Sequence, residues 1–246
     1  LRALRLRQPP AADHALAADL ATRAGTLLLA IRARLAADGA PAALLKHEGD
    51  QSSHDFLMAA LAEHRPGDAV LSEEGTAHAV HPDRSGAERT WIVDPVDGTR
   101  EYSEPPRSDW AVHVALVEAG RPTAGAVALP ALDLTLSTVG PPATAGFPPV
   151  GTSPRMVVSR SRPPAEALAV CAALGGQLVE MGSAGAKAMA VVRGEVDAYV
   201  HSGGQYEWDS CAPVAVAEAA GLHTSRIDGS PLVYNCPDPY LPDLVI

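Results

Sequence analysis

The stretch DPVDGT at residues 94–99 places two carboxylates three positions apart, directly after the apolar run 91–93. The apolar run predicts a buried strand, which the proline ends, and the glycine permits a tight turn. Asp94 and Asp97 are therefore expected to lie close together. Since like charges at short range are costly, either one carboxyl is protonated or a cation lies between them. Oxygen ligands favour a hard cation, Mg²⁺ before Ca²⁺ or Mn²⁺.

Two further acidic clusters lie at the ends of predicted elements. Glu73 and Glu74 follow the apolar run 69–71, and Asp209 stands directly before the helical pattern 210–220. Each has a simpler interpretation, because a glutamate pair is usually a solvated surface feature and Asp209 can act as a helix N-cap. Taken singly, neither cluster identifies a site.

Hydrophobic periodicity divides the chain into two parts joined by the Pro- and Gly-rich stretch 140–149. Residues 1–150 predict an α+β subdomain whose antiparallel sheet carries the acidic motifs, and residues 151–246 predict an α/β subdomain on the substrate side, with the site between them. The predicted helices are 13–39, 56–63, 165–174, 184–193 and 210–220, and the predicted strands are 69–71, 91–93, 109–118, 123–129, 133–139, 156–159, 177–181 and 198–201, with one more near the C-terminus.

The composition is that of an acidic globular protein, with 246 residues, 47% of them hydrophobic, and a formal net charge of -10. Such a charge is unsuited to binding nucleic acid or an anionic membrane surface, and no apolar run reaches the length that spans a bilayer. Three cysteines without a C-x-x-C pair argue against a disulfide framework or a structural zinc site. We therefore expect a cytoplasmic monomer or homodimer that acts on a small molecule.

Several motifs together make the chain similar to the inositol monophosphatase superfamily of Mg²⁺-dependent, lithium-sensitive phosphatases. The string D-P-x-D-G-T is very specific, because its fixed positions arise by chance in a chain of this size with a probability on the order of one in ten thousand. The resemblance runs from about Lys46 to Asn235. Its motifs are the E-E pair at 73–74, DPVDGT at 94–99, GSAGAK at 182–187, WDSCAP at 208–213, EAAG at 218–221 and DGSPLVYN at 228–235.

This resemblance implies a layered α-β-α-β-α sandwich of the α+β or α/β class, as in inositol monophosphatase and fructose-1,6-bisphosphatase. It implies two or three Mg²⁺ ions and an in-line attack of metal-activated water on a phosphate monoester, without a phosphoenzyme. Thr99, with Glu73, matches the pair that positions the water, and Gly98 and Thr99 would offer backbone N–H groups to the phosphate. The implied catalytic residues are Glu73, Asp97 and Thr99. The implied metal ligands are the side chains of Glu73, Asp94, Asp97 and Asp209 and the backbone carbonyl of Val96.

One position departs from the family pattern. Many members carry T-x-x-D after an early lysine, and its aspartate helps to hold a further, weaker metal ion. Here Lys46 is followed by GDQSSHD at residues 49–55, which places His54, or Asp55 after a shift of one residue, at the aspartate position. Because imidazole prefers softer metals, we expect an altered third metal site and a weaker response to lithium.

The residues after DPVDGT point to one branch of the family. Arg100-Glu101-Tyr102 resembles the D-G-T-[KR]-E-[FY] of the bisphosphate nucleotidases, and Ser202 stands where the inositol branch has a glutamate. The resemblance therefore implies hydrolysis of the 3'-phosphate of 3'-phosphoadenosine 5'-phosphate to AMP and phosphate, within sulfate assimilation. The alternative is an inositol monophosphatase or fructose-1,6-bisphosphatase activity. A non-catalytic nucleotide- or metal-binding module is disfavoured by the intact set of acidic motifs.

Three polar residues of the second half are candidates for binding the substrate. Ser183 and Lys187 belong to GSAGAK, whose lysine matches a nucleotidase lysine, and Arg160 belongs to the S-R-S-R stretch 159–162. Lys187 and Arg160 are expected to engage the second phosphate of the substrate. The alternatives are an arginine in a solvated loop and a lysine that pairs with an acid.

Overall fold

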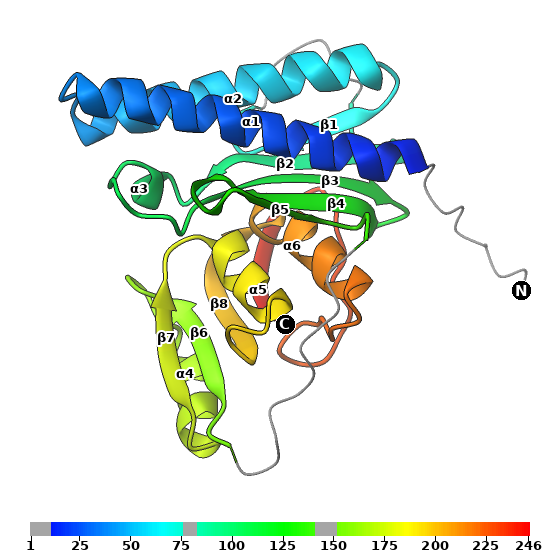
Figure 1. Cartoon of the computed structure of the whole chain (residues 1–246). Helices are drawn as coiled ribbons and strands as arrows, with labels where there is room; N and C mark the ends of the chain where they lie inside the picture. The colour runs from blue at the N-terminus through cyan, green and yellow to red at the C-terminus, as the bar shows by residue number, and fades with distance from the viewer. Residues whose placement is uncertain (1–10, 76–82, 141–151) are drawn as a thin grey trace, which may run out of the picture.

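Layers of helices and β-sheets alternate through the molecule (Figure 1). The computed structural model describes residues 11–75, 83–140 and 152–246. In order, the layers are an outer helix pair, at the top of Figure 1, a five-stranded sheet, a middle layer of helices, a four-stranded sheet and a single outer helix. The layered α-β-α-β-α sandwich expected from the sequence is confirmed.

The outer helix pair consists of α1 (Ala11–Ala37) and α2 (Ala42–His64), which pack on each other and on one face of the first sheet. Leucines spaced along both helices fill this interface, and Leu20, Leu28 and Leu57 are fully buried. The predicted helix 56–63 was too short. After an apolar first turn, α2 continues with the polar run 46–55, so the apolar periodicity that marks its second half is missing there.

The first sheet has the strand order β1-β2-β3-β4-β5. Because helices cover both faces, its inner strands are nearly continuous apolar runs. The prediction of a wholly antiparallel sheet was wrong at one position, since β1 pairs with β2 in parallel. The strands are β1 (Ala69–Ser72), β2 (Arg89–Asp97), β3 (Ala111–Glu118), β4 (Arg121–Leu129) and β5 (Leu134–Ser137), with a 3-10 turn, η1 (Pro130–Leu132), between the last two.

Two helices, α5 (Ala184–Val192) and α6 (Glu207–Ala219), form the middle layer and contact both sheets (Figure 1). Every residue of α5 is buried, which its small side chains allow. Helix α6 begins earlier than predicted. Asp209 therefore lies within the first turn of α6. Its carboxylate accepts from the backbone N–H of the N-cap residue Tyr206 at 2.7 Å, so the simpler interpretation of Asp209 as the N-cap itself is wrong.

The second sheet has the order β7-β6-β8-β9, and its outer face is covered by α4 (Ala165–Ala173). β6 is parallel to β7 and β8, whereas β9 is antiparallel to β8. β8 is longer than the predicted strand 198–201, because its pairing with β9 continues to Tyr206. The strands are β6 (Arg155–Ser159), β7 (Gln177–Met181), β8 (Ala198–Tyr206) and β9 (Tyr240–Val245).

The stretch predicted as a linker, 140–149, lies outside the described residues apart from Gly140. The division of the chain at residue 150 stays a prediction. Side chains from both parts share one hydrophobic cluster, which includes Ile92 of β2 and Met189 of α5. The middle helices thus fix the position of the first sheet relative to the second half of the chain.

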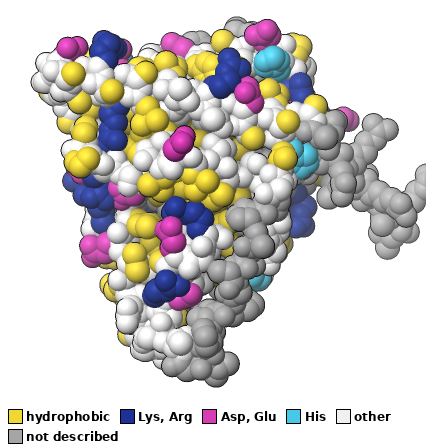
Figure 2. Space-filling view, in the orientation of Figure 1, with side chains coloured by type: hydrophobic (Ala, Val, Ile, Leu, Met, Phe, Trp, Pro, Cys, Tyr) yellow, Lys and Arg dark blue, Asp and Glu magenta, His cyan; other side chains and the backbone are white. Residues whose placement is uncertain are grey.

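Charged side chains of both signs are interspersed on the face shown in Figure 2. This mixed distribution gives that face no single sign of charge. In the part of the chain that the structure describes, no helix combines the length and apolar character that crossing a membrane requires.

Candidate active site

Acidic side chains from separate parts of the chain meet where β1, β2 and α6 approach one another. Carboxylate oxygens of Asp94, Asp97 and Asp209 all lie within 4.8 Å of one another. Glu73 follows β1 and is in hydrogen-bond contact with Asp94. Because β1 runs parallel to β2, Glu73 at the end of β1 lies beside Asp94. The structure thus brings together the four side chains predicted as metal ligands, whose role stays a prediction.

Three hydrogen bonds hold the turn that follows Asp94. The carboxylate Oδ1 of Asp94 accepts from the backbone N–H of Val96 at 3.1 Å. From α2, the Ser53 hydroxyl donates to the Pro95 carbonyl at 2.8 Å. The Thr99 hydroxyl donates to the Val96 carbonyl at 3.1 Å. The Val96 carbonyl, predicted as a metal ligand, and the Thr99 hydroxyl, predicted to position water, therefore lie side by side.

The turn needs glycine at position 98, where φ is +82°, a left-handed conformation that other residues rarely adopt. A Cβ atom at Gly98 would also lie 2.9 Å from Cβ of Ser183. The short helix α3 (Thr99–Tyr102) starts directly after the glycine. The backbone N–H groups of Gly98 and Thr99, predicted to bind phosphate, are thus at the start of this helix.

Asp97 is anchored more firmly than the other acids of the cluster. Its carboxylate accepts from the Ser183 hydroxyl and from the backbone N–H groups of residues 184–185, at 3.1 and 2.6 Å. Nε2 of the buried His113 lies 3.1 Å from Asp97, and Nδ1 of the same ring lies 2.9 Å from the Trp208 carbonyl. Burial opposes the charge of Asp97, but His113 and Ser183 outweigh it and lower its pKa to about 2. Asp97 is therefore ionised at neutral pH.

The other acids of the cluster have raised pKa values. Burial and the charge of Asp209 raise the pKa of Glu73 to about 7. Burial and the charge of Asp97 raise the pKa of Asp209 to about 7. Asp94 is only 1% exposed, and burial together with the charge of Glu73 raises its pKa well above the ordinary value.

This donor set fits divalent cations. Among the described residues, no lysine or arginine forms an ion pair with Glu73, Asp94 or Asp209. Gathering unpaired carboxylates in a buried place costs free energy, which bound cations offset. All the donors are oxygens, the ligands that hard cations prefer. The residues present can therefore hold metal ions.

We expect the thermal stability of the metal-free protein to fall as the pH rises from about 5 to about 8. The ordinary pKa values of Asp and Glu in an unfolded chain are about 4, whereas those of Glu73 and Asp209 in the folded chain are about 7. Between these values the folded state binds more protons than the unfolded state. The resulting stabilisation is complete below the unfolded pKa and is lost as the pH rises through the folded pKa.

Mg²⁺ must compete with these protons, so the increase in Tm that Mg²⁺ causes should be larger at about pH 8 than at about pH 5. Thermal unfolding at both pH values, with EDTA or with Mg²⁺, measures the two effects together. An increase in Tm that is the same at both pH values would contradict the raised pKa values of the cluster.

A further acid, Asp50 of α2, belongs to the site and was missed by the sequence analysis. Its carboxyl interacts with the side chain of Thr99. Burial and the nearby charge of Glu74 raise the pKa of Asp50 to about 7. Asp50 therefore stands beside the hydroxyl that the family resemblance assigns to positioning water.

The prediction that His54 or Asp55 takes this place was wrong. Since α2 is continuous from Ala42, His54 lies one helical turn beyond Asp50. Nδ1 of the buried His54 lies 3.0 Å from the Ser72 hydroxyl, next to Glu73. Asp55 is exposed and accepts a hydrogen bond from Gln51 at 2.9 Å. The helical register identifies Asp50, and the predicted start at residue 56 concealed that register.

Lys187, predicted to engage a phosphate, has its ammonium group in contact with the protein. It is 3% exposed and donates to the carbonyls of Gly182 and Ser183, the latter at 2.8 Å. Its Nζ lies 5.3 Å from the centre of the Tyr199 ring. Burial lowers the pKa of Lys187 to about 8. Any phosphate that Lys187 binds must share the ammonium group with these carbonyls.

Ser183 and Arg160, also predicted to bind substrate, contact acidic side chains. Ser183 donates its hydroxyl to Asp97. Arg160 pairs with Glu101 and Glu104, at 2.6 and 2.9 Å. Their roles toward a substrate stay predictions, and the arginine is not the solvated loop residue of the simpler interpretation.

Comparison with known sequences, over most of the chain, identifies the same family as the motifs of the sequence. Residues 14–241 match the profile of the inositol monophosphatase family. The chain is 49% identical to a protein of Mycobacterium leprae named 3'-phosphoadenosine 5'-phosphate phosphatase, across 95% of this chain and 88% of that protein. It is 31% identical to the 3'(2'),5'-bisphosphate nucleotidase CysQ of Escherichia coli, across 78% of this chain and 80% of that protein.

Comparison with solved structures gives the same fold. CysQ from Bacteroides thetaiotaomicron has a TM-score of 0.73 and 27% identity, covering 95% of this chain and 96% of that chain. Inositol monophosphatase II from Staphylococcus aureus has a TM-score of 0.76 at 21% identity, covering 96% of this chain and 88% of that chain, and so shares the fold. With its acidic motifs gathered in one site, the chain belongs to the inositol monophosphatase family.

Proposed function

We propose that this protein is a Mg²⁺-dependent phosphatase that hydrolyses the 3'-phosphate of 3'-phosphoadenosine 5'-phosphate to AMP and phosphate, within sulfate assimilation. The observation that carries the proposal is the convergence of Glu73, Asp94, Asp97 and Asp209 beside Thr99. The substrate is supported by the names of relatives at 49 and 31% identity and by the sequence Arg100-Glu101-Tyr102. A cytoplasmic location and a monomeric or homodimeric state stay predictions.

Metal ions would be held by the acidic cluster and by one backbone carbonyl. A phosphate ester is itself an anion, so the cluster would repel it unless cations intervened. Mg²⁺ is proposed because every donor is an oxygen atom and because Mg²⁺ commonly binds through carboxylates together with substrate phosphates. When bound, such ions lower the pKa of water and stabilise charge on the leaving oxygen. The proposed ligands are Glu73, Asp94, Asp97, Asp209 and the Val96 carbonyl.

The chain's own residues would position the attacking water and remove its proton. By turning its single proton from the Val96 carbonyl to the carboxylate of Asp50, the Thr99 hydroxyl can accept from the water. As the water attacks phosphorus in line with the leaving 3'-oxygen, its proton passes through the Thr99 hydroxyl to Asp50 or directly to Glu73. Both acids have a pKa of about 7, which suits a general base at neutral pH.

The phosphate group under attack would rest on the backbone N–H groups of Gly98 and Thr99. The 5'-phosphate of the substrate is proposed to lie near the start of α5, where Ser183 and Lys187 stand. Lys187 is suited to this task because its buried ammonium group interacts with Asp97 and Asp209 of the cluster. It therefore offers positive charge within reach of the proposed metal site.

Phosphate release from three substrates tests this function. With Mg²⁺, we expect kcat/KM for 3'-phosphoadenosine 5'-phosphate to exceed the values for inositol 1-phosphate and fructose 1,6-bisphosphate by about tenfold or more. EDTA should abolish the activity. An advantage of about tenfold for either of the other substrates would assign the chain to that activity instead. Absence of turnover on all three substrates would favour a binding module.

A further inference from the structure

Glu101 and Arg160, to which the proposed reaction assigns no step, form an ion pair with each other. Glu101 lies in α3, directly after DPVDGT, and Arg160 follows β6 in the S-R-S-R stretch. Nε of Arg160 lies 2.6 Å from Oε1 of Glu101, and Nη2 lies 2.9 Å from Oε2 of Glu104. The Glu101–Arg160 pair thus joins the first half of the chain to the second half, beside the acidic cluster.

Burial makes the two carboxylates unequal partners of Arg160. The side chain of Glu101 is 7% exposed, whereas that of Glu104 is 41% exposed. An exposed ion pair such as that with Glu104 contributes little, because water screens it. Removing the arginine from Glu101 would instead leave a buried carboxylate without a compensating charge. Arg160 therefore supplies the compensating charge for the buried carboxylate of Glu101.

The pair bears directly on the residues that lead into α5. A Cβ atom at Gly182 would lie 2.2 Å from Cδ of Glu101, so the Glu101 carboxyl packs closely against the backbone there. The backbone N–H of Arg160 donates to the Met181 carbonyl at 2.9 Å. The backbone N–H of Gly182 donates to the carboxylate of Asp109 at 2.7 Å. Both members of the pair thus contact the chain at residues 181–182.

Asp97 is held between the same two segments. It stands four positions before Glu101 in the chain, and its carboxylate is bound by the N–H groups of residues 184–185, just beyond Gly182. A shift of α3 relative to the start of α5 would therefore move Asp97 relative to its hydrogen-bond donors. The Glu101–Arg160 pair connects these two segments by side chains.

We infer that Arg160 and Glu101 are positioning residues: their ion pair fixes α3 against the start of α5 and thereby places Asp97. On this inference, which rests on the proposed phosphatase function, Arg160 does not bind the second phosphate of the substrate. Its guanidinium already forms ion pairs with two carboxylates, so little of its positive charge is left for an anion. The role assigned to Arg160 from the sequence alone is replaced by this one.

Two substrates that differ only in the second phosphate separate the two roles. We expect Arg160→Met and Glu101→Gln each to lower kcat on the order of 10- to 100-fold, both for 3'-phosphoadenosine 5'-phosphate and for 3'-AMP, because a small displacement of reacting groups costs this much. The double variant should be no worse than the more affected single variant, since both remove one interaction. If Arg160 binds the 5'-phosphate, Arg160→Met raises KM for the bisphosphate and leaves 3'-AMP unaffected, which overturns the inference.

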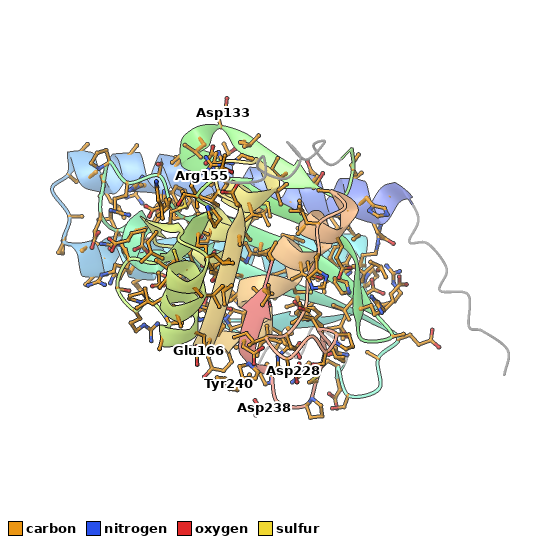
Figure 3. The ribbon with its side chains drawn as sticks, turned by 90° about the horizontal axis from the view of Figure 1, so that it is seen from below. Asp133, Arg155, Glu166, Asp228, Asp238 and Tyr240 are labelled. Atoms are coloured by element: carbon orange, nitrogen blue, oxygen red, sulfur yellow. The ribbon has the colours of Figure 1, made fainter. Side chains whose placement is uncertain are left out.

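Arg155→Met is the matched control. Arg155 begins β6, at the other end of the strand from the S-R-S-R stretch, and pairs with Asp197 at 3.1 Å. In Figure 3, Arg155 is labelled in the upper half of the view, and Glu166 and Tyr240 are labelled in the lower half. This variant removes the same kind of ion pair, and its kcat should equal that of the wild type. Unchanged kcat in Arg160→Met, as in Arg155→Met, would also overturn the inference.

The Arg160 and Glu101 variants will not be informative if the buried ion pair is needed for folding, so a further variant keeps both charges. Gly182→Ala should displace the Glu101 carboxyl and lower kcat on both substrates alike. If the wild type hydrolyses neither nucleotide, the proposed function fails. The positioning role of the Glu101–Arg160 pair is then tested by Mg²⁺ binding. The Mg²⁺ concentration that gives half of the Tm shift should rise in Arg160→Met and not in Arg155→Met, and equal values in the two variants would overturn the inference.

Discussion

The variant Asp97→Asn is expected to lose on the order of a thousandfold in kcat while it keeps its fold, because a preorganised charge at the reacting centre is worth this much. Asp97 is the acid of the cluster that is fully ionised at neutral pH, with a pKa of about 2. The substitution removes that charge and keeps the size of the side chain. The amide oxygen can still accept from the N–H of Gly185, whereas the N–H of Ala184, which donates to the other carboxylate oxygen, loses its acceptor.

Asp197→Asn provides the control for this loss. Asp197 also accepts a backbone N–H, that of Arg155, at 2.7 Å, and it also pairs with a cation, but it lies outside the cluster. Both variants should unfold cooperatively by circular dichroism, and Mg²⁺ should raise the Tm of Asp97→Asn less than that of Asp197→Asn. Near-normal kcat in Asp97→Asn at saturating Mg²⁺ would exclude it as a metal ligand.

The sequence predicts the parts of this fold that depend on local pattern. Apolar runs mark the buried strands, and the alternation of strands and helices after residue 151 is found as predicted, because most of these elements contain an apolar stretch of their own. The turn at 94–99 is likewise local, since proline ends the run and Gly98 allows the left-handed conformation. Asp94 and Asp97 therefore converge as the spacing predicts.

What the sequence leaves open depends on contacts between distant segments. The parallel pairing of β1 with β2 brings Glu73 to Asp94, and the short apolar run of β1 carries no information on its direction. Similarly, Arg160 carries a charge that suits a phosphate or a carboxylate, and only the packing of α3 against the end of β6 selects Glu101 as its partner. In both cases tertiary contacts decide what local pattern cannot.

The start of α2 shows how an error in one element spreads to the site. A helix that begins at residue 56 leaves Asp50 in a loop, where its position relative to Thr99 is undefined. The observed helix, Ala42–His64, places Asp50 on the same face as Ser53, whose hydroxyl holds the Pro95 carbonyl. Polar residues that point toward a site remove the apolar periodicity by which a helix is recognised, so functional segments of helices are those most easily missed.

Asp50→Asn should lower kcat by about 10²- to 10³-fold, the usual contribution of a positioned general base. The amide keeps the shape of the side chain and can still accept a hydrogen bond from Thr99, but it cannot take a proton from the water. Folding should not suffer, because burial and the charge of Glu74 hold the pKa of Asp50 at about 7 and thus disfavour its ionised form. The Tm of the metal-free variant should therefore equal or exceed that of the wild type.

Asp55→Asn is the control on the same helix, and it also tests the register predicted from the sequence. Asp55 is exposed and contacts Gln51, so its substitution should leave kcat and Tm unchanged. Thr99→Ala should lower kcat about as much as Asp50→Asn, and the double variant should lose little more, because a proton path through one hydroxyl is removed only once. Additive losses in the double variant would separate Asp50 from Thr99, and a loss in Asp55→Asn with normal kcat in Asp50→Asn would restore the register that the helix contradicts.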